Sequence, residues 1–397
     1  MKTVGIVAEY NPFHNGHLYH IEQIRRTLGA DVAIIAVMSG NYTQRAEPAF
    51  FHKADRAACA IRCGVDLVLE LPFPFSSAAA ETFAQSSVSI LKSIGDVDFL
   101  SFGSESGDIE AIRTVSERLC CEDFSRARQA AIDRYPELGH ARITEMTYRE
   151  LYGDGPAFTP NNILAFEYLS ALHACHSRAV PHTVTRIGGS YSADTLSPVY
   201  SGASAIRRAI ECGNGEALAQ LPPPVAETVA DKMQRGHLPT SMQRIYPAIA
   251  AKFLLGNGVP DVPDGGDGLY FRLCSTVLQA TDLQSFIERT QTKRHTRSRI
   301  RRVILNTLLG VTSSDLSVFP RYTQLLGASP TGLSLLKQIK DRTDFPILTK
   351  PSDADKLPDG AMRQKALSDL ADRLYCLTLP VPSEPYSALT YTPYIHK

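Results

Sequence analysis

The chain lacks the features that would place it in a membrane or outside the cell. No run of about 18 or more apolar residues occurs, and Met1 leads into a short apolar segment without a signal-peptide cleavage pattern. The chain also lacks an excess of either charge, with 41 Lys and Arg against 41 Asp and Glu, which argues against indiscriminate nucleic-acid binding. We therefore expect a soluble, cytoplasmic protein.

A disulfide framework is missing as well. The eight cysteines are scattered over 397 residues rather than gathered in a small secreted scaffold, so we expect reduced thiols. Cys59 and Cys63 lie four residues apart, but no second Cys or His pair is spaced to complete a zinc site, so we expect them to pack rather than bind metal. The composition that is present, 44% hydrophobic and 21% charged residues, is typical of a globular protein of two domains, or of one large domain with an appendage.

Short apolar segments alternate with helical patterns over the first hundred residues. We expect buried strands at 3–8, 32–38, 65–71 and 97–102, with helices between them at 18–28, 51–61 and 80–93. Strands that are apolar on both faces are typical of a parallel sheet covered by helices. The predicted fold class is therefore α/β, with a Rossmann-like, doubly wound parallel sheet.

The remaining chain is mainly helical in pattern. After a helical stretch at 108–175 and a strand at 182–187, we expect the sheet domain to end near residue 212, before the run Leu221-Pro222-Pro223-Pro224. Further helices are expected at 242–255, 269–280, 283–290 and 294–309. We accordingly predict an α/β domain at 1–215 and a mainly helical domain at 225–397, of more mixed character from about residue 320.

The most informative motif lies between the first strand and the first helix. It is a His-x-Gly-His pattern formed by His14, Gly16 and His17. Gly16 allows close approach of a ligand to the backbone, and the helix N-terminus favours an anion such as phosphate. Two imidazoles there can donate hydrogen bonds to the α-phosphate of ATP and to departing pyrophosphate. The pattern also recurs by chance, and the histidines could instead cap the helix or bind a metal, although a third metal ligand is not nearby.

A second segment, residues 201–208, offers a further phosphate site. We expect Ser201 or Ser204 to cap the following helix and Arg207 to reach the β- and γ-phosphates, although this segment taken alone is explained better by an ordinary capped surface helix. Lys53 is expected either to reach phosphate or to lie on a solvated helix face.

Four further residues are candidates because they lie at the ends of strands or beside a helix. Gly103 ends a strand, where a side chain would crowd a base or ribose. Asn161 and Asn162 flank a helix and Arg186 lies at a strand end, and for these the alternatives are caps or surface ion pairs.

A basic segment interrupts the otherwise neutral chain. Residues 292–302 contain six Lys and Arg without an acid. Arg294, Arg297 and Arg301 fall at i, i+3 and i+7 of an expected helix whose apolar stripe would anchor it, so these arginines and Lys293 are candidates for contact with RNA phosphates. A solvated basic face or a set of ion pairs is the alternative.

These motifs together resemble those of the bacterial tRNA(Met) cytidine acetate ligase family, within the HxGH nucleotidyltransferase superfamily. The segments similar to that family are, in order, 4–17, 38–41, 44–45, 64–72, 102–105, 160–164 and 292–294. Two residues depart from its pattern, since Ala46 stands where Gly is expected and His295 where Tyr is expected.

The resemblance implies an ATP-dependent ligase. Such an enzyme activates acetate as acetyl-adenylate and transfers the acetyl group to N4 of the wobble cytidine of elongator tRNA(Met), forming N4-acetylcytidine. Residues 1–215 would then bind ATP, and residues 225–397 would bind tRNA. The catalytic residues expected are His14, His17 and Arg207. The ATP contacts that the resemblance implies are Val7, Ala8, Glu9, Tyr10, Asn11, Pro12, Phe13, His14, Asn15, Gly16, His17, Leu18, Tyr19, His20, Gly103, Asn161, Asn162 and Arg186, to which the motif at 201–208 adds Ser204.

Other functions stay open at this point. Mg²⁺ is compatible with bound ATP, although no carboxylate cluster specifies a site for it. A small-molecule adenylyltransferase or acyl-adenylate ligase, such as pantothenate synthetase, would share the His-x-Gly-His motif without needing a basic helical domain. A noncatalytic RNA-binding or nucleotide-sensing protein is the second alternative. The sequence does not define the oligomeric state.

Overall fold

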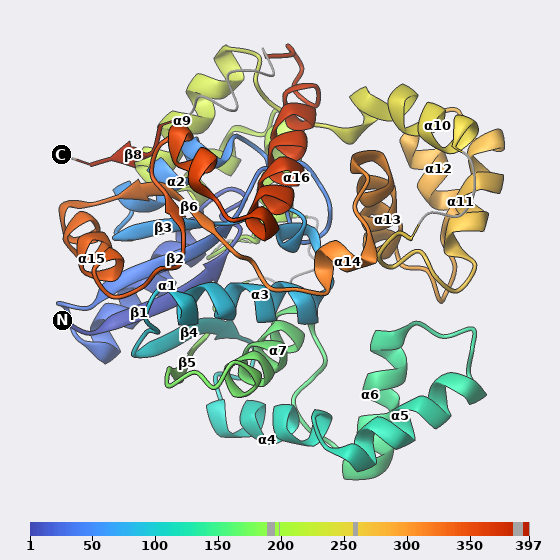
Figure 1. Cartoon of the computed structure of the whole chain (residues 1–397), viewed down its shortest axis with the longest axis horizontal. Helices are drawn as coiled ribbons and strands as arrows, with labels where there is room; N and C mark the ends of the chain where they lie inside the picture. The colour runs from blue at the N-terminus through green and yellow to red at the C-terminus, as the bar shows by residue number, and fades with distance from the viewer. Residues whose placement is uncertain (189–194, 198, 257–260, 384–391, 397) are drawn as a thin grey trace.

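A twisted, mostly parallel sheet forms the centre of the molecule (Figure 1). The computed structural model describes residues 1–188, 195–197, 199–256, 261–383 and 392–396. The strands are β1 Thr3–Ala8, β2 Ala33–Ser39, β3 Leu67–Leu71, β4 Phe99–Ser104, β5 Val180–Thr185, β6 Thr323–Ala328, β7 Ile347–Leu348 and β8 Tyr394–Ile395. Their order is β5-β4-β1-β2-β3-β6-β7, with β8 paired to β6. β1 to β5 are parallel, and β1 lies between β2 and β4, so the chain changes direction across the sheet at β1.

Helices cover both faces of this sheet. On one face α3 Ala80–Ser93, α4 Ile109–Leu119, α7 Pro160–Ala174 and α15 Pro330–Lys340 pack on residues such as Ile35 and Leu69. On the other, α1 Asn15–Leu28, α2 Lys53–Arg62, α8 Ala203–Glu211 and α9 Pro223–Gln234 pack on residues such as Ile34 and Val68. Neighbouring strand residues thus bury opposite faces, which explains the uninterrupted apolar strands.

Two helical groups project from the sheet on the right of Figure 1. One consists of α5 Glu122–Arg134 and α6 His140–Tyr152. The other consists of α10 Tyr246–Leu255, α11 Leu269–Thr276, α12 Leu283–Thr290 and α13 Arg297–Leu309, which share a core that includes Phe286 and Ile300. The short α14 Ser313–Leu316 leads back toward the sheet, and α16 Asp359–Cys376 packs against α13 through a cluster that contains Leu305 and Leu367.

The predicted α/β class and the alternation of strands and helices over the first hundred residues are confirmed. The sheet does not end near residue 212, however. β6 adds to the edge of the sheet antiparallel to β3, and the Thr323 hydroxyl donates a hydrogen bond of 2.6 Å to the Glu70 carbonyl. The sheet therefore draws strands from both predicted domains, and their boundaries at 215 and 225 remain a prediction. No helix in the described ranges is both long enough and apolar enough to cross a bilayer.

Candidate active site

A cavity of about 360 Å³ lies at the carboxyl ends of β1, β4 and β5. Its wall includes Ala8 from β1, Gly103 from β4 and Thr185 from β5, together with the starts of α1, α7 and α8. Because β1 has β2 on one side and β4 on the other, this position is the topological switch point at which open α/β sheets bind ligands. Three helix N-termini at one cavity also favour an anion.

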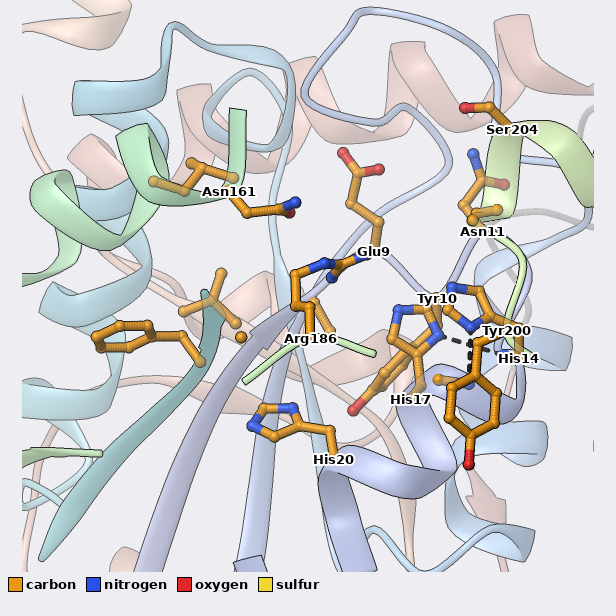
Figure 2. A pocket seen from close by; sticks show the side chains of 18 of the residues that line it. Glu9, Tyr10, Asn11, His14, His17, His20, Asn161, Arg186, Tyr200 and Ser204 are labelled. Carbon is orange, nitrogen blue, oxygen red and sulfur yellow. Dashed lines mark hydrogen bonds between the residues drawn. The ribbon is translucent and has the colours of Figure 1, made fainter. Parts of the chain in front are cut away.

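The two motif histidines cap α1 and line the cavity at once. The Nδ1 atom of His14 accepts from the Gly16 amide at 3.1 Å, and Nδ1 of His17 accepts from the His14 amide at 3.2 Å. Their rings stack with centroids 3.8 Å apart (Figure 2). Since each Nδ1 is an acceptor, the hydrogen-bond network assigns the proton of each neutral ring to Nε2. Helix capping is thus compatible with nucleotide binding, because it leaves a donor on each ring.

Burial keeps these imidazoles neutral. It lowers the pKa of His14 to about 3, with a smaller contribution from the charge of Arg186. Burial also lowers the pKa of His17 well below its ordinary value, with His14, Arg186 and His20 contributing less. Both rings are therefore neutral Nε2–H donors near pH 7, which suits binding of phosphate oxygens without proton transfer.

Gly16 lines the cavity and also makes room for the capping histidine. A Cβ atom placed on Gly16 would lie only 2.9 Å from the His14 ring. The missing side chain therefore makes room for the capping imidazole, while close approach of a ligand to Gly16 stays a prediction. Any larger residue would displace His14 from the helix terminus.

Not every residue of the segment from Val7 to His20 reaches the cavity. The cavity-lining members are Val7, Ala8, Glu9, Tyr10, Asn11, His14, Gly16, His17, Tyr19 and His20, whereas Pro12, Phe13, Asn15 and Leu18 are not part of its wall. Phe13 is fully buried in the core beneath α1. Asn15 instead donates a hydrogen bond of 3.1 Å to the Ala219 carbonyl.

Arg207 and Ser204 both line the cavity from α8. Arg207 donates from Nη1 to the Asn11 carbonyl at 2.7 Å, which places its guanidinium against the His-x-Gly-His turn. The expectation that Ser201 or Ser204 caps α8 is wrong. The N-cap residue is Gly202, which has no side chain, while the Ser201 hydroxyl accepts from the Ser197 amide at 2.8 Å. The first amides of α8 are thus left without a side-chain cap at the cavity.

Asn161 and Asn162 have different roles. Asn161 lines the cavity and donates to the Glu105 carboxylate at 2.7 Å. Asn162 is 1% exposed, accepts from the Glu105 amide at 3.2 Å and donates to the Ala157 carbonyl at 2.9 Å. Of the two, therefore, Asn161 is placed to contact a ligand, and Asn162 holds the loop around Glu105.

Gly103 makes room for Arg186. A Cβ atom at Gly103 would lie 3.2 Å from Cγ of Arg186, so the direct neighbour of this glycine is the arginine stem. Arg186 itself points into the space between Glu9 and His17 (Figure 2). The absence of a side chain at Gly103 thus allows the guanidinium of Arg186 to lie in the cavity.

Several wall residues were not among the predicted ligands. They include Tyr168, Glu105, Tyr200 and the loop residues Gln44 and Glu47. Tyr168 follows Asn161 by seven residues on α7, with Leu164 between them, so helical spacing from a candidate could have identified it. The others are brought to the cavity by tertiary structure.

The prediction for Lys53 is wrong in both of its forms. Lys53 is 2% exposed, and its Nζ atom lies 2.7 Å from Glu70 and 2.6 Å from Asp372. Burial would lower the pKa of Lys53, but the two carboxylates outweigh it and raise that pKa above its ordinary value. Lys53 begins α2 on the side that α16 covers, so it neither reaches phosphate nor faces solvent.

The predicted nucleic-acid residues lie at the start of α13. The helix begins at Arg297, so Lys293 and Arg294 lie in the preceding loop and the expected i, i+3, i+7 arrangement fails for Arg294. Arg294 pairs with Asp267 at 2.7 Å, Arg297 with Glu288 at 3.7 Å and Arg301 with Glu47 at 2.5 Å. The alternative of ion pairs is thus realised for these arginines, while their contact with RNA stays a prediction.

The two residues that depart from the family pattern both lie in loops. Ala46 adopts φ +54°, a left-handed conformation that favours glycine. His295 is 6% exposed and its amide donates to the Thr292 hydroxyl at 2.9 Å, so it packs inside the loop rather than presenting a ring to RNA.

The fold and the cavity define a nucleotidyltransferase of the HIGH class, and the comparison with known families agrees. A family model described as HIGH Nucleotidyl Transferase matches residues 1–387. The chain is 33% identical to the tRNA(Met) cytidine acetate ligase of Acetivibrio thermocellus over 96% of each chain. It is 37% identical to that of Syntrophotalea carbinolica, over 89% of this chain and 85% of the relative.

Solved structures extend this likeness to three dimensions. Thermotoga maritima TmcAL in its apo form matches with a TM-score of 0.91 at 28% identity, covering 100% of this chain and 99% of the other. The same protein bound with alpha-thio ATP matches with a TM-score of 0.89 at 28% identity, covering 100% of both chains. The chain belongs to the HIGH nucleotidyltransferases and, among them, to the tRNA(Met) cytidine acetate ligase family.

In the described part of the chain, no group of three or more His, Cys, Asp and Glu side chains could hold a metal ion. These described residues therefore do not fit a Mg²⁺ site held by the protein alone.

Proposed function

We propose that the protein acetylates N4 of the wobble cytidine of elongator tRNA(Met), using acetate and ATP. The observation that carries this proposal is the pair of neutral imidazoles at a cavity where three helices begin. Relatives named for this reaction match the chain over nearly its whole length, which favours it over a small-molecule adenylyltransferase. A cytoplasmic location is part of the same proposal, because the substrate is a tRNA.

The first step forms acetyl-adenylate. A carboxylate oxygen of acetate attacks the α-phosphorus of ATP, and the bond from that phosphorus to the oxygen bridging the β-phosphate breaks, releasing pyrophosphate. Nε2–H of His14 and His17 would donate to phosphate oxygens as charge builds on them, and Arg207 would pair with the departing pyrophosphate. Rate enhancement then comes from positioning and fixed charges, and no covalent enzyme intermediate is required.

The second step transfers the acetyl group. The N4 amine of cytidine attacks the carbonyl carbon of acetyl-adenylate, the bond to the phosphate oxygen breaks, AMP leaves, and the amine loses a proton to solvent. The wobble base must leave the anticodon stack to reach the anhydride. Lys293, Arg294, Arg297 and Arg301 are the residues that we propose for the tRNA backbone.

ATP is held, in this proposal, by the cavity-lining part of the segment from Val7 to His20, with Gly103, Asn161, Arg186 and Ser204. Pro12, Phe13, Asn15, Leu18 and Asn162 support those residues from behind the wall. Mg²⁺ would enter with the triphosphate rather than occupy a site of the protein.

The test uses purified protein with ATP, isotopically labelled acetate and an elongator tRNA(Met) transcript. We expect acetate-dependent pyrophosphate release and labelled N4-acetylcytidine on nucleoside analysis, and no label in a transcript whose wobble cytidine is replaced by uridine. Pyrophosphate release without transfer to RNA would instead support the small-molecule ligase. Absence of both reactions would contradict an enzyme of either kind.

A further inference from the structure

A single carboxylate joins the ATP cavity to the basic helix. Glu47 lies with its Oε1 atom 2.5 Å from Nη1 of Arg301 on α13 and its Oε2 atom 3.8 Å from Nη2 of Arg207 on α8. Arg207 also donates to the Asn11 carbonyl at 2.7 Å, so its guanidinium lies at the His-x-Gly-His turn. Glu47 thus pairs with one arginine proposed for the triphosphate and one proposed for RNA.

Hydrogen bonds define the conformation of the loop that carries Glu47. The Thr43 amide donates to the Glu47 carbonyl at 3.0 Å, and the Ala46 amide donates to the Thr43 carbonyl at 2.8 Å. The same loop is tied to the cavity, because the Gln44 amide donates to the Glu9 carboxylate at 2.8 Å. The carboxylate is therefore presented from a hydrogen-bonded loop.

This loop also packs directly on the basic helix. Tyr42 and Ala46 share a buried cluster with Leu305 and Leu309 of α13. Arg301 lies one turn before Leu305 on that helix, which keeps its guanidinium beside Glu47. The loop between β2 and α2 is thus the physical connection between the two proposed binding surfaces.

We propose that Glu47 is a positioning residue for which Arg207 and Arg301 compete, so that ATP and tRNA weaken each other's binding. This inference rests on the proposed function. When a triphosphate pairs with Arg207, the carboxylate of Glu47 pairs with Arg301 alone. It then opposes contact of Arg301 with an RNA phosphate. When pyrophosphate departs, Glu47 returns to Arg207 and releases Arg301. The acceptor RNA is thereby favoured after acetyl-adenylate has formed.

The size of the effect follows from the exposure of the three side chains. Glu47, Arg207 and Arg301 are 29%, 21% and 28% exposed, so solvent screens both pairs partly. Pairs of this kind contribute little in water, which predicts that either ligand weakens the other about two- to five-fold. Linkage requires the factor to be the same in both directions.

The experiment measures binding of a tRNA(Met) transcript with and without α,β-methylene ATP, at one fixed ionic strength. We expect the analogue to raise the Kd of the transcript about two- to five-fold in the natural protein. In Glu47→Gln each ligand, when present singly, should bind as tightly as before or more tightly. The factor by which one ligand raises the Kd of the other should fall to near one. Glu227→Gln is the matched control, because Glu227 pairs with Arg62 at 2.9 Å on a remote surface, and it should keep the natural factor.

An unchanged factor in Glu47→Gln, or no mutual effect in the natural protein, would overturn the proposal. Acetate transfer to the same transcript separates this failure from that of the proposed function. If the natural protein acetylates the RNA while Glu47→Gln keeps the factor, only the competition is wrong. If the natural protein neither binds nor acetylates the RNA, the proposed function fails and the competition fails with it.

Discussion

The ammonium group of Lys53 lies 2.6 Å from the carboxylate of Asp372, although the two residues are 319 positions apart. Glu70 shares the same ammonium at 2.7 Å, and Asn41 donates to Asp372 at 2.8 Å. This buried network joins α2, β3 and α16 directly behind the loop that carries Glu47.

Removing the cation from this network should destabilise the fold strongly. Lys53→Met leaves two buried carboxylates without their shared partner, so we expect the free energy of unfolding to fall by about 3–5 kcal/mol, measured by urea denaturation. Arg126→Met is the control, because Arg126 and its partner Asp123 are 78% and 80% exposed. It should change stability by less than about 0.5 kcal/mol. Equal effects of the two substitutions would contradict the buried-network account.

The neutral histidines predict loss of stability in mild acid. The folded pKa of His14 is lowered to about 3, so between that value and the unfolded value near 6.5 the unfolded state binds the extra proton. This contribution is therefore complete above pH 6.5 and is lost as the pH falls toward 3. From pH 7 to pH 5 we expect His14→Gln to lose about 1–2 kcal/mol less stability than the natural protein in urea unfolding. An identical loss in both would show that His14 is already charged in the folded state.

Substitution of either imidazole should slow activation of acetate. His14→Ala or His17→Ala removes one donor to developing phosphate charge, and we expect acetate-dependent ATP–pyrophosphate exchange to fall about 10²- to 10³-fold. His173→Ala, at an exposed position of α7, should leave the exchange rate unchanged. A loss below about ten-fold for both motif histidines would exclude them from the transition state.

Neighbouring asparagines should respond differently to the same change. Asn161→Ala should raise KM for ATP while the unfolding midpoint stays nearly constant, because the side chain faces the cavity. Asn162→Ala removes two buried hydrogen bonds and should cost about 1–3 kcal/mol in urea denaturation. The reverse pattern would mean that Asn162 is the nucleotide contact.

The loop before α13 should contribute affinity for RNA without sequence selectivity. We expect Lys293→Gln combined with Arg294→Gln to weaken binding of the tRNA transcript and to lower the slope of log affinity against log salt by about one unit for each RNA phosphate that is no longer neutralised. Arg235→Gln, at the C-cap of α9, removes one positive charge elsewhere and should leave the slope unaltered. ATP–pyrophosphate exchange measured without RNA should be retained, and its abolition would contradict separate binding surfaces.

Local periodicity was sufficient for the strands and helices around the cavity. β1, α1, β2 and α3 follow the expected apolar patterns, because each buries one continuous apolar surface. The His-x-Gly-His turn was likewise readable, since its residues are adjacent in sequence and its chemistry is local. The contact of its glycine with the ring of His14 was not predicted, because it depends on how that ring folds back over the turn.

Features that depend on distant partners could not be predicted in this way. The sequence does not distinguish Lys53 from a solvent-exposed helical lysine, because its partners Glu70 and Asp372 are distant along the chain. The strand β6 has an ordinary apolar pattern, and only the open edge of β3 determines that it joins the sheet. Ser201 resembles a helix cap, but its hydroxyl is engaged by Ser197 in the preceding loop.

The placement of β6 and α16 constrains how the protein is made on the ribosome. β3 acquires its outer neighbour only when residues 323–328 have emerged, and Lys53 acquires its second carboxylate only with residue 372. A nascent chain that stops earlier carries an open strand edge and an incompletely neutralised lysine. The wall of the nucleotide cavity comes from residues 6–207, so it emerges well before the strand and the helix that complete the fold. The unfinished chain is therefore expected to depend on chaperones.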